Sequence, residues 1–400
     1  MNPSTINSVP DVRPELNRSA VIRLALAYAA ATNGLVLTPF LVSAIMSRLH
    51  LGEGAATEIA GLEILGVALS CAVLPRWISR AASTFTIAGV LGTIIAQALS
   101  MFAPTAATMS MARGMAGLFE GFLFVIVASG VSHRASADRV WGQINLFAGG
   151  INGSVLVAIS LLPDASVSRG LFLLLVGLIA VMSPFILGIG AFASGGRRSC
   201  IGSSTVKPPK KLVFAIWVVT VLIYGTQASQ WAVAGIVGER CGLSSSTIGI
   251  LLSLSSLLGF AGAIIPSQRA SHAHRLMIIW LAQLVMIVSI IEFFGSTGGR
   301  SYFLSQVTLN CAFFVVIPFL TGLLSEIDPD GSLVARTVVV TFAGAGIGTG
   351  VAGQFFNAYG GRQFALVLGI CIAAALPFVW AALRGATRHT ADNAAHQLTS

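Results

Sequence analysis

Twelve apolar segments follow one another along this chain, and each is long enough to cross a lipid bilayer as a helix. A helix needs about 20 mostly apolar residues to span the hydrocarbon core. Only 9% of the 400 residues are charged, against about 25% in soluble domains. The sequence therefore predicts an all-α, multi-pass membrane protein with twelve transmembrane helices. The segments cover residues 20–47, 55–75, 83–103, 107–131, 141–162, 169–193, 212–236, 245–266, 275–294, 302–325, 334–357 and 363–384.

One long connection, residues 194–211, divides the segments into two sets of six. It is rich in Gly, Ser and Pro and carries five cations, which is typical of a solvated linker. The other connections are too short to hold a soluble domain. We therefore expect five parts: an N-terminal tail (1–19), an N-terminal six-helix bundle (20–193), the linker (194–211), a C-terminal six-helix bundle (212–385) and a C-terminal tail (386–400).

The basic residues test this topology, because Lys and Arg collect in the cytoplasmic loops of membrane proteins. With the N-terminus placed in the cytoplasm, 17 Lys and Arg side chains fall on the cytoplasmic side and five on the other. Arg113 lies within a segment, which accounts for all 23. Both termini are therefore predicted to be cytoplasmic. The cations are scattered between apolar segments, so the net charge of +9 indicates a membrane-lipid environment and no nucleic-acid partner.

These features resemble the major facilitator superfamily (MFS) of secondary transporters. Arg113 followed by Gly117 is similar to a pattern of its fourth helix, whereas the loop after segment two keeps Arg80 but lacks the usual aspartate and glycines. The acidic residues of "EIAGLEILG" (58–66) and "GLFEG" (117–121) resemble a group of proteobacterial members with acidic residues in helices two and four. The resemblance implies two pseudo-symmetric six-helix bundles, alternating access and a bacterial inner-membrane location.

Three ionisable residues lie deep within apolar segments, where a charge costs about 3 kcal/mol on insertion scales. Arg113 and Glu120 share one face of segment four because they are seven residues apart, and Glu63 lies in segment two. A carboxyl group in apolar surroundings can exchange a proton near neutral pH. We therefore expect Glu63, Glu120 and Arg113 to couple protons to transport. Arg113 could instead bind an anionic substrate, or form a fixed tie to carbonyls or to an acidic side chain of a neighbouring helix.

Polar and aromatic residues of segments one, four, seven and ten are the candidate substrate contacts, because the resemblance places these segments around a central site. Gln227, Gln230 and Trp231 lie on one stripe of their helix. The structural alternatives are that amides join helices in lipid and that Trp231 anchors at the membrane interface. The complete set is Asn33, Arg113, Glu120, Gln227, Gln230, Trp231 and Asn310.

Enzyme motifs are missing from the sequence: it has no Walker A loop, no H-E-x-x-H zinc site and no histidine within an apolar segment. We therefore expect no enzyme activity, no metal and no cofactor, with a proton gradient as the energy source. The leading hypothesis is a monomeric, proton-coupled transporter for a small organic solute that is anionic or zwitterionic and partly apolar. The alternative is a proton/drug antiporter that exports amphipathic or cationic compounds. Loops this short do not favour a receptor or scaffold.

Overall fold

The computed structural model describes residues 16–131, 137–162, 167–193, 208–327 and 332–399. Within these ranges the chain is helical, with short turns and no strand. The predicted all-α membrane fold is therefore confirmed. The expected N-terminal tail (1–19) and linker (194–211) lie mostly outside the described residues.

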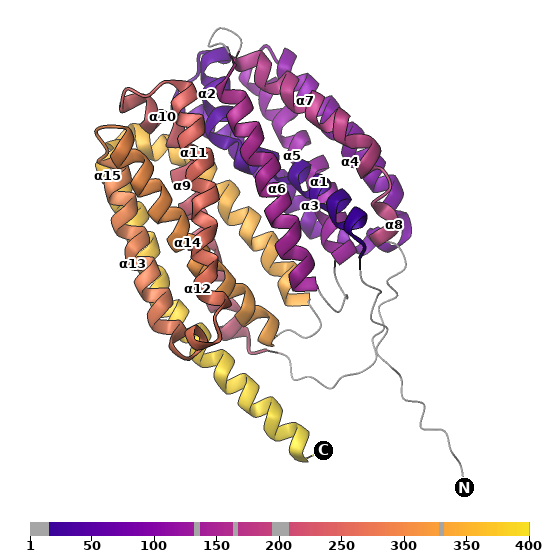
Figure 1. The fold of residues 1–400 in the computed structure, drawn as a ribbon, viewed down its shortest axis with the longest axis vertical. Helices are drawn as coiled ribbons and strands as arrows, with labels where there is room; N and C mark the ends of the chain where they lie inside the picture. Colours follow the sequence, from indigo (N-terminus) through magenta and orange to yellow (C-terminus); the bar gives the residue numbers. More distant parts are fainter. Residues whose placement is uncertain (1–15, 132–136, 163–166, 194–207, 328–331, 400) are drawn as a thin grey trace.

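The N-terminal half consists of helices that run back and forth across the bundle (Figure 1). Each of the first six predicted segments corresponds to one helix or to two that follow end to end. Their bounds are α1 Arg18–Val36, α2 Thr38–Leu49, α3 Glu53–Val73, α4 Pro75–Phe102, α5 Ala106–Val131, α6 Ala137–Ser160, α7 Val167–Ile186 and α8 Gly190–Ala193.

The C-terminal half repeats this arrangement. Its elements are α9 Lys210–Ala232, α10 Ala234–Arg240, α11 Ser245–Gly259, α12 Ile264–Ser267, α13 Arg275–Phe294, α14 Gly299–Ile327 and α15 Ser332–Thr399, with 3-10 turns at Phe260–Ala263 and Arg269–His274.

Eleven helices in the described part of the chain are long and apolar enough to span a bilayer. The last of them, α15, crosses twice, because Gly360 interrupts it at a φ of 76°, a value that glycine adopts readily. The two halves of α15 bring the number of crossings to twelve, as predicted. Residues 386–399, expected to form a tail, continue α15 as a helix beyond the bundle (Figure 1).

Two helices break at corresponding places in the two halves. α1 gives way to α2 at Leu37, and α9 gives way to α10 at Val233, with a ψ of 5° at both residues. Pro39 explains the first break, because it has no N–H to donate to the Leu35 carbonyl. The Thr38 hydroxyl donates to that carbonyl instead, at 2.9 Å. We call Leu37 and Val233 the paired breaks; the sequence analysis treated each helix as continuous.

Two polar contacts between the halves lie at one end of the bundle. α1 begins and α15 ends toward the same end, which we call the terminal end, and the opposite end is the far end (Figure 1). At the far end Arg240 Nη2 lies 2.8 Å from Glu53 Oε1. Nearby, the Gly353 amide donates to the Thr57 hydroxyl at 3.0 Å. Both contacts connect the C-terminal half to α3.

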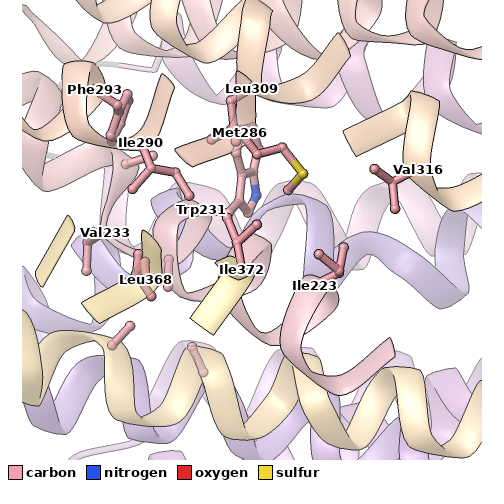
Figure 2. Packing of buried hydrophobic residues seen from close by; sticks show 14 of the residues in the cluster. Ile223, Trp231, Val233, Met286, Ile290, Phe293, Leu309, Val316, Leu368 and Ile372 are labelled. Carbon is pink, nitrogen blue, oxygen red and sulfur yellow. The ribbon is translucent and has the colours of Figure 1, made fainter. Parts of the chain in front are cut away.

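The hydrophobic core of the C-terminal half surrounds Trp231, which lies with Ile223, Met286 and Leu309 (Figure 2). The same core continues into the N-terminal half through Leu37. The paired breaks therefore lie within a continuous apolar contact between the halves.

Candidate functional site

Arg113 of α5 forms a two-point ion pair with Glu63 of α3. Its Nη2 contacts Glu63 Oε1, and its Nε donates to Glu63 Oε2 at 3.2 Å. The side chain of Arg113 is 0% exposed and that of Glu63 is 1% exposed. A guanidinium and a carboxylate match in such a fork geometry, which is the strongest form of ion pair. The structure therefore shows the tie between Arg113 and an acidic side chain of a neighbouring helix.

Two residues of α4 accept further hydrogen bonds from the guanidinium. Arg113 Nη1 donates to Gln97 Oε1 at 2.7 Å and to Ser100 Oγ at 3.3 Å. On a further side, the Phe172 ring of α7 lies 5.6 Å from Arg113 Cζ. Four helices thus enclose Arg113, and four hydrogen bonds use most of its five N–H groups.

Glu120 joins this group through Gln97. The Gln97 amide donates to Glu120 Oε1 at 3.4 Å. Glu120 is 1% exposed. Arg113 and Glu120 share one face of α5, as predicted, but Gln97 connects them in place of a direct contact. We call Glu63, Gln97, Arg113 and Glu120 the charge ring.

Glycines allow the helices to approach closely at the charge ring. A side chain at Gly117 would overlap the backbone of Glu63, and one at Gly34 of α1 would overlap the Glu63 carboxyl group. The Arg113–Gly117 spacing thus has a physical basis: Gly117 brings α5 onto α3 at Glu63, and Arg113 binds the side chain of that same residue.

The charge ring has a simple proton count. Two carboxylates and one guanidinium would leave one uncompensated negative charge, which is costly in a site that excludes water. The arrangement can therefore hold one exchangeable proton. The charge ring is sealed within the N-terminal half, since Arg113, Glu63 and Glu120 are at most 1% exposed.

A second polar group lies between α9 and α14. Gln227 Nε2 donates to Asn310 Oδ1 at 3.1 Å, and Gln230 Nε2 donates to Gln306 Oε1 at 2.8 Å. Gln306 Nε2 in turn donates to Asn310 Oδ1 at 3.4 Å. The structure thus brings together three of the candidate substrate contacts, Gln227, Gln230 and Asn310.

The other two candidates, Trp231 and Asn33, lie apart from this group. Trp231 is 9% exposed, inside the core, and its Nε1 donates to the Val36 carbonyl at 3.0 Å. Asn33 is fully buried, and neither polar atom of its side chain has a hydrogen-bond partner. Trp231 therefore packs within protein, away from lipid.

Two residues were missed from the sequence. Gln97 links Arg113 to Glu120 within the charge ring, and Gln306 links Gln230 to Asn310 within the second polar group. Each is a glutamine within an apolar segment, which is a visible but unspecific signal because amides also join helices. Among the described residues, no three His, Cys, Asp or Glu side chains gather as a metal site would require.

No family model and no curated protein matches the sequence. Solved structures nevertheless share its fold. A mutant of the nucleoside transporter NupG has a TM-score of 0.70 at 13% identity, over 90% of this chain and 99% of that one. A bacterial homolog of the human lysosomal transporter Spinster, inward-facing and occupied, has a TM-score of 0.69 at 15% identity, over 94% and 99%. Its inward-facing, unoccupied form has a TM-score of 0.66 at 14% identity, over 95% and 99%. The chain therefore shares the helical fold of these solved transporter structures.

Proposed function

We propose that this protein is a proton-coupled secondary transporter that moves a small organic solute across the bacterial inner membrane by alternating access. The charge ring is the observation that carries the proposal. It places two carboxyl groups and one guanidinium, all fully buried, in a fold whose solved relatives are transporters. Buried ionisable groups of transport proteins typically serve as proton relays.

The proton on the charge ring is the coupling element. With one proton bound, Glu63, Glu120 and Arg113 sum to zero charge, and the N-terminal half packs tightly around them. When the proton leaves, a negative charge remains that only water or a rearranged partner can stabilise. Loss of the proton thus favours a conformation in which α3 and α5 separate enough to admit water, so proton exchange and conformational change are linked.

The rest of the proposal follows from the same arrangement. One chain supplies both halves, so it functions as a monomer with both termini in the cytoplasm. The proton gradient is the energy source, and no metal, cofactor or catalytic step is involved. The partners are the solute, protons and membrane lipid.

Proton-driven flux in proteoliposomes tests the proposal. A solute found by a thermal-shift screen should accumulate against its gradient when a pH gradient is imposed. Glu120→Gln should lose this accumulation but retain exchange of solute across the membrane, because an amide cannot release a proton. Glu58→Gln is the control, since Glu58 lies at the far end, exposed, beside Gln354. Undiminished gradient-driven accumulation by Glu120→Gln would refute proton coupling.

The same experiment separates uptake from export. Symport moves the solute in the direction of the proton flow, and antiport moves it against that flow. Export of cationic drugs toward an acidic pair is less compatible with the geometry, because Glu63 and Glu120 are already engaged by Arg113 and Gln97.

A further inference from the structure

Gln227 and Asn310 each keep one hydrogen-bonding atom unused between α9 and α14, and Gln230 Oε1 of the same group is also without a partner. Their mutual hydrogen bond, from Gln227 Nε2 to Asn310 Oδ1, uses one atom of each amide. Gln227 Oε1 and Asn310 Nδ2 remain, and both are buried without a hydrogen-bond partner. A buried polar atom without a partner costs about 1–3 kcal/mol. These two atoms are therefore unfavourable unless something binds them.

The two atoms are complementary to one chemical pattern. Gln227 Oε1 accepts a hydrogen bond and Asn310 Nδ2 donates one, so together they match a group with an adjacent N–H and C=O. Reversing both amides would exchange the roles but still leave one donor and one acceptor. Gln306, which donates to Asn310 Oδ1 at 3.4 Å, favours the orientation described.

Aromatic rings flank this pair of amides. Tyr224 lies three residues before Gln227 on α9, and Phe313 lies three residues after Asn310 on α14, so each shares a helix face with its amide. The Tyr224 and Phe313 rings meet edge to face, with centroids 5.3 Å apart. Such rings favour a flat ligand.

Arg113, the buried cation that could bind an anionic cargo, already uses its N–H groups within the protein. Arg113 donates four hydrogen bonds to Glu63, Gln97 and Ser100. The amide pair itself carries no charge. The chemistry around Gln227 and Asn310 therefore favours an uncharged cargo over the anionic or zwitterionic one expected from the sequence.

We propose that Gln227 and Asn310 recognise an uncharged, planar solute through an edge with one N–H donor and one C=O acceptor, as in a carboxamide, a lactam or a pyrimidine-like ring. The proposal rests on the proposed transport function, because it names the cargo class of that transporter. It places the cargo in the C-terminal half, between α9 and α14, while the proton is held in the N-terminal half.

Three probes of equal shape test the donor and acceptor pattern: benzamide, benzoate and benzamidinium. Benzamide offers one donor and one acceptor, benzoate offers two acceptors, and benzamidinium offers two donors. Affinities follow from the rise in Tm of the purified full-length protein with probe concentration. We expect benzamide to bind most tightly. Preference for benzoate or benzamidinium, or binding of none of the three, would overturn the proposal.

Variants of the pair make the test specific. Asn310→Asp replaces the donor Nδ2 with a second acceptor, so the preference should change to benzamidinium. Gln227→Met removes the hydrogen bonds of this side chain while keeping its size. It should lower the affinity for benzamide by about tenfold, the effect of one neutral hydrogen bond. Gln283→Met on α13 is the matched control, because Gln283 is also a buried amide with both polar atoms unpartnered. Equal behaviour of the Gln227 and Gln283 variants would contradict the proposal.

The outcome is independent of proton coupling. Probe binding needs no proton gradient. The expected ranking of the three probe affinities can therefore hold even if Glu120→Gln leaves solute accumulation intact and so refutes proton coupling. Conversely, proton-driven transport of an anion would uphold the proposed function and overturn only this inference.

Discussion

The indole Nε1 of Trp231 donates a hydrogen bond to the carbonyl oxygen of Val36, 3.0 Å away. Val36 is the last residue of α1 and Trp231 is the second-last residue of α9, so this bond ties the paired breaks together across the two halves. A contact of this kind must separate when the far end opens in an alternating-access cycle.

We predict that Trp231→Phe shifts the protein toward a conformation open at the far end. Phenylalanine fills much of the same space but leaves the buried Val36 carbonyl unpaired, at a cost of about 1–3 kcal/mol. Distances between spin labels on the loops after α2 and α13 should lengthen. Trp217→Phe is the matched control, because Trp217 Nε1 donates to Thr337 Oγ1 at 3.1 Å within the C-terminal half alone. The same lengthening in both variants would contradict the prediction.

The Arg113–Glu63 pair is expected to be strongly coupled. Arg113→Met or Glu63→Met alone leaves the other charge buried without its partner and should lower the free energy of unfolding by about 3–5 kcal/mol. The double variant should cost clearly less than the sum of the two. Reversible unfolding in mixed micelles measures these values.

The exposed ion pair at the far end is the control for these measurements on Arg113 and Glu63. The side chains of Arg240 and Glu53 are 53% and 15% exposed, so Glu53→Gln should cost at most about 1 kcal/mol. Strictly additive effects at Arg113 and Glu63 would show that the two do not depend on one another.

Two glycines of α5 offer a test of the close contact between α3 and α5. Gly117→Ala places a methyl group against the backbone of Glu63, which should force the helices apart and lower Tm. Gly114→Ala places the same group where no atom lies within 4 Å, so Tm should stay equal or rise slightly, since alanine favours a helix by about 1 kcal/mol. A similar loss in both variants would mean that the close approach at Gly117 is not what matters.

Infrared spectroscopy can detect the proton of the charge ring. At neutral pH the protein should show the C=O stretching band of a protonated carboxylic acid, because we propose that Glu63 or Glu120 holds one proton. The band should vanish in Glu120→Gln and persist in Glu58→Gln. Its persistence in Glu120→Gln would assign the proton to another group.

The fold could be predicted almost completely from the sequence, because the physics involved is local. Each apolar segment has to be a helix in lipid, since no water is present to form hydrogen bonds with its backbone. The distribution of cations predicts on which side of the membrane each connection lies. The breaks were harder to foresee. Pro39 is a visible signal for the first, but the residues around Val233 include no proline to mark the second.

The site was predictable only where the chemistry lies on one helix. The shared face of Arg113 and Glu120 follows from their spacing along α5. That Glu63 and Gln97 complete the charge ring depends on how α3 and α4 pack against α5, which the spacing of residues along one helix does not specify. The pairing of Gln227 with Asn310 likewise joins two helices that are about 80 residues apart in sequence.

The order of Glu63 and Arg113 along the chain bears on how the protein is made. An arginine entering a membrane by itself carries a penalty that its own helix cannot offset. Here α3, which carries Glu63, is synthesised before α5, which carries Arg113. The Glu63 carboxylate can therefore be in the bilayer before Arg113 leaves the ribosome. The N-terminal half can therefore assemble its charged interior during translation, before any residue of the other half exists.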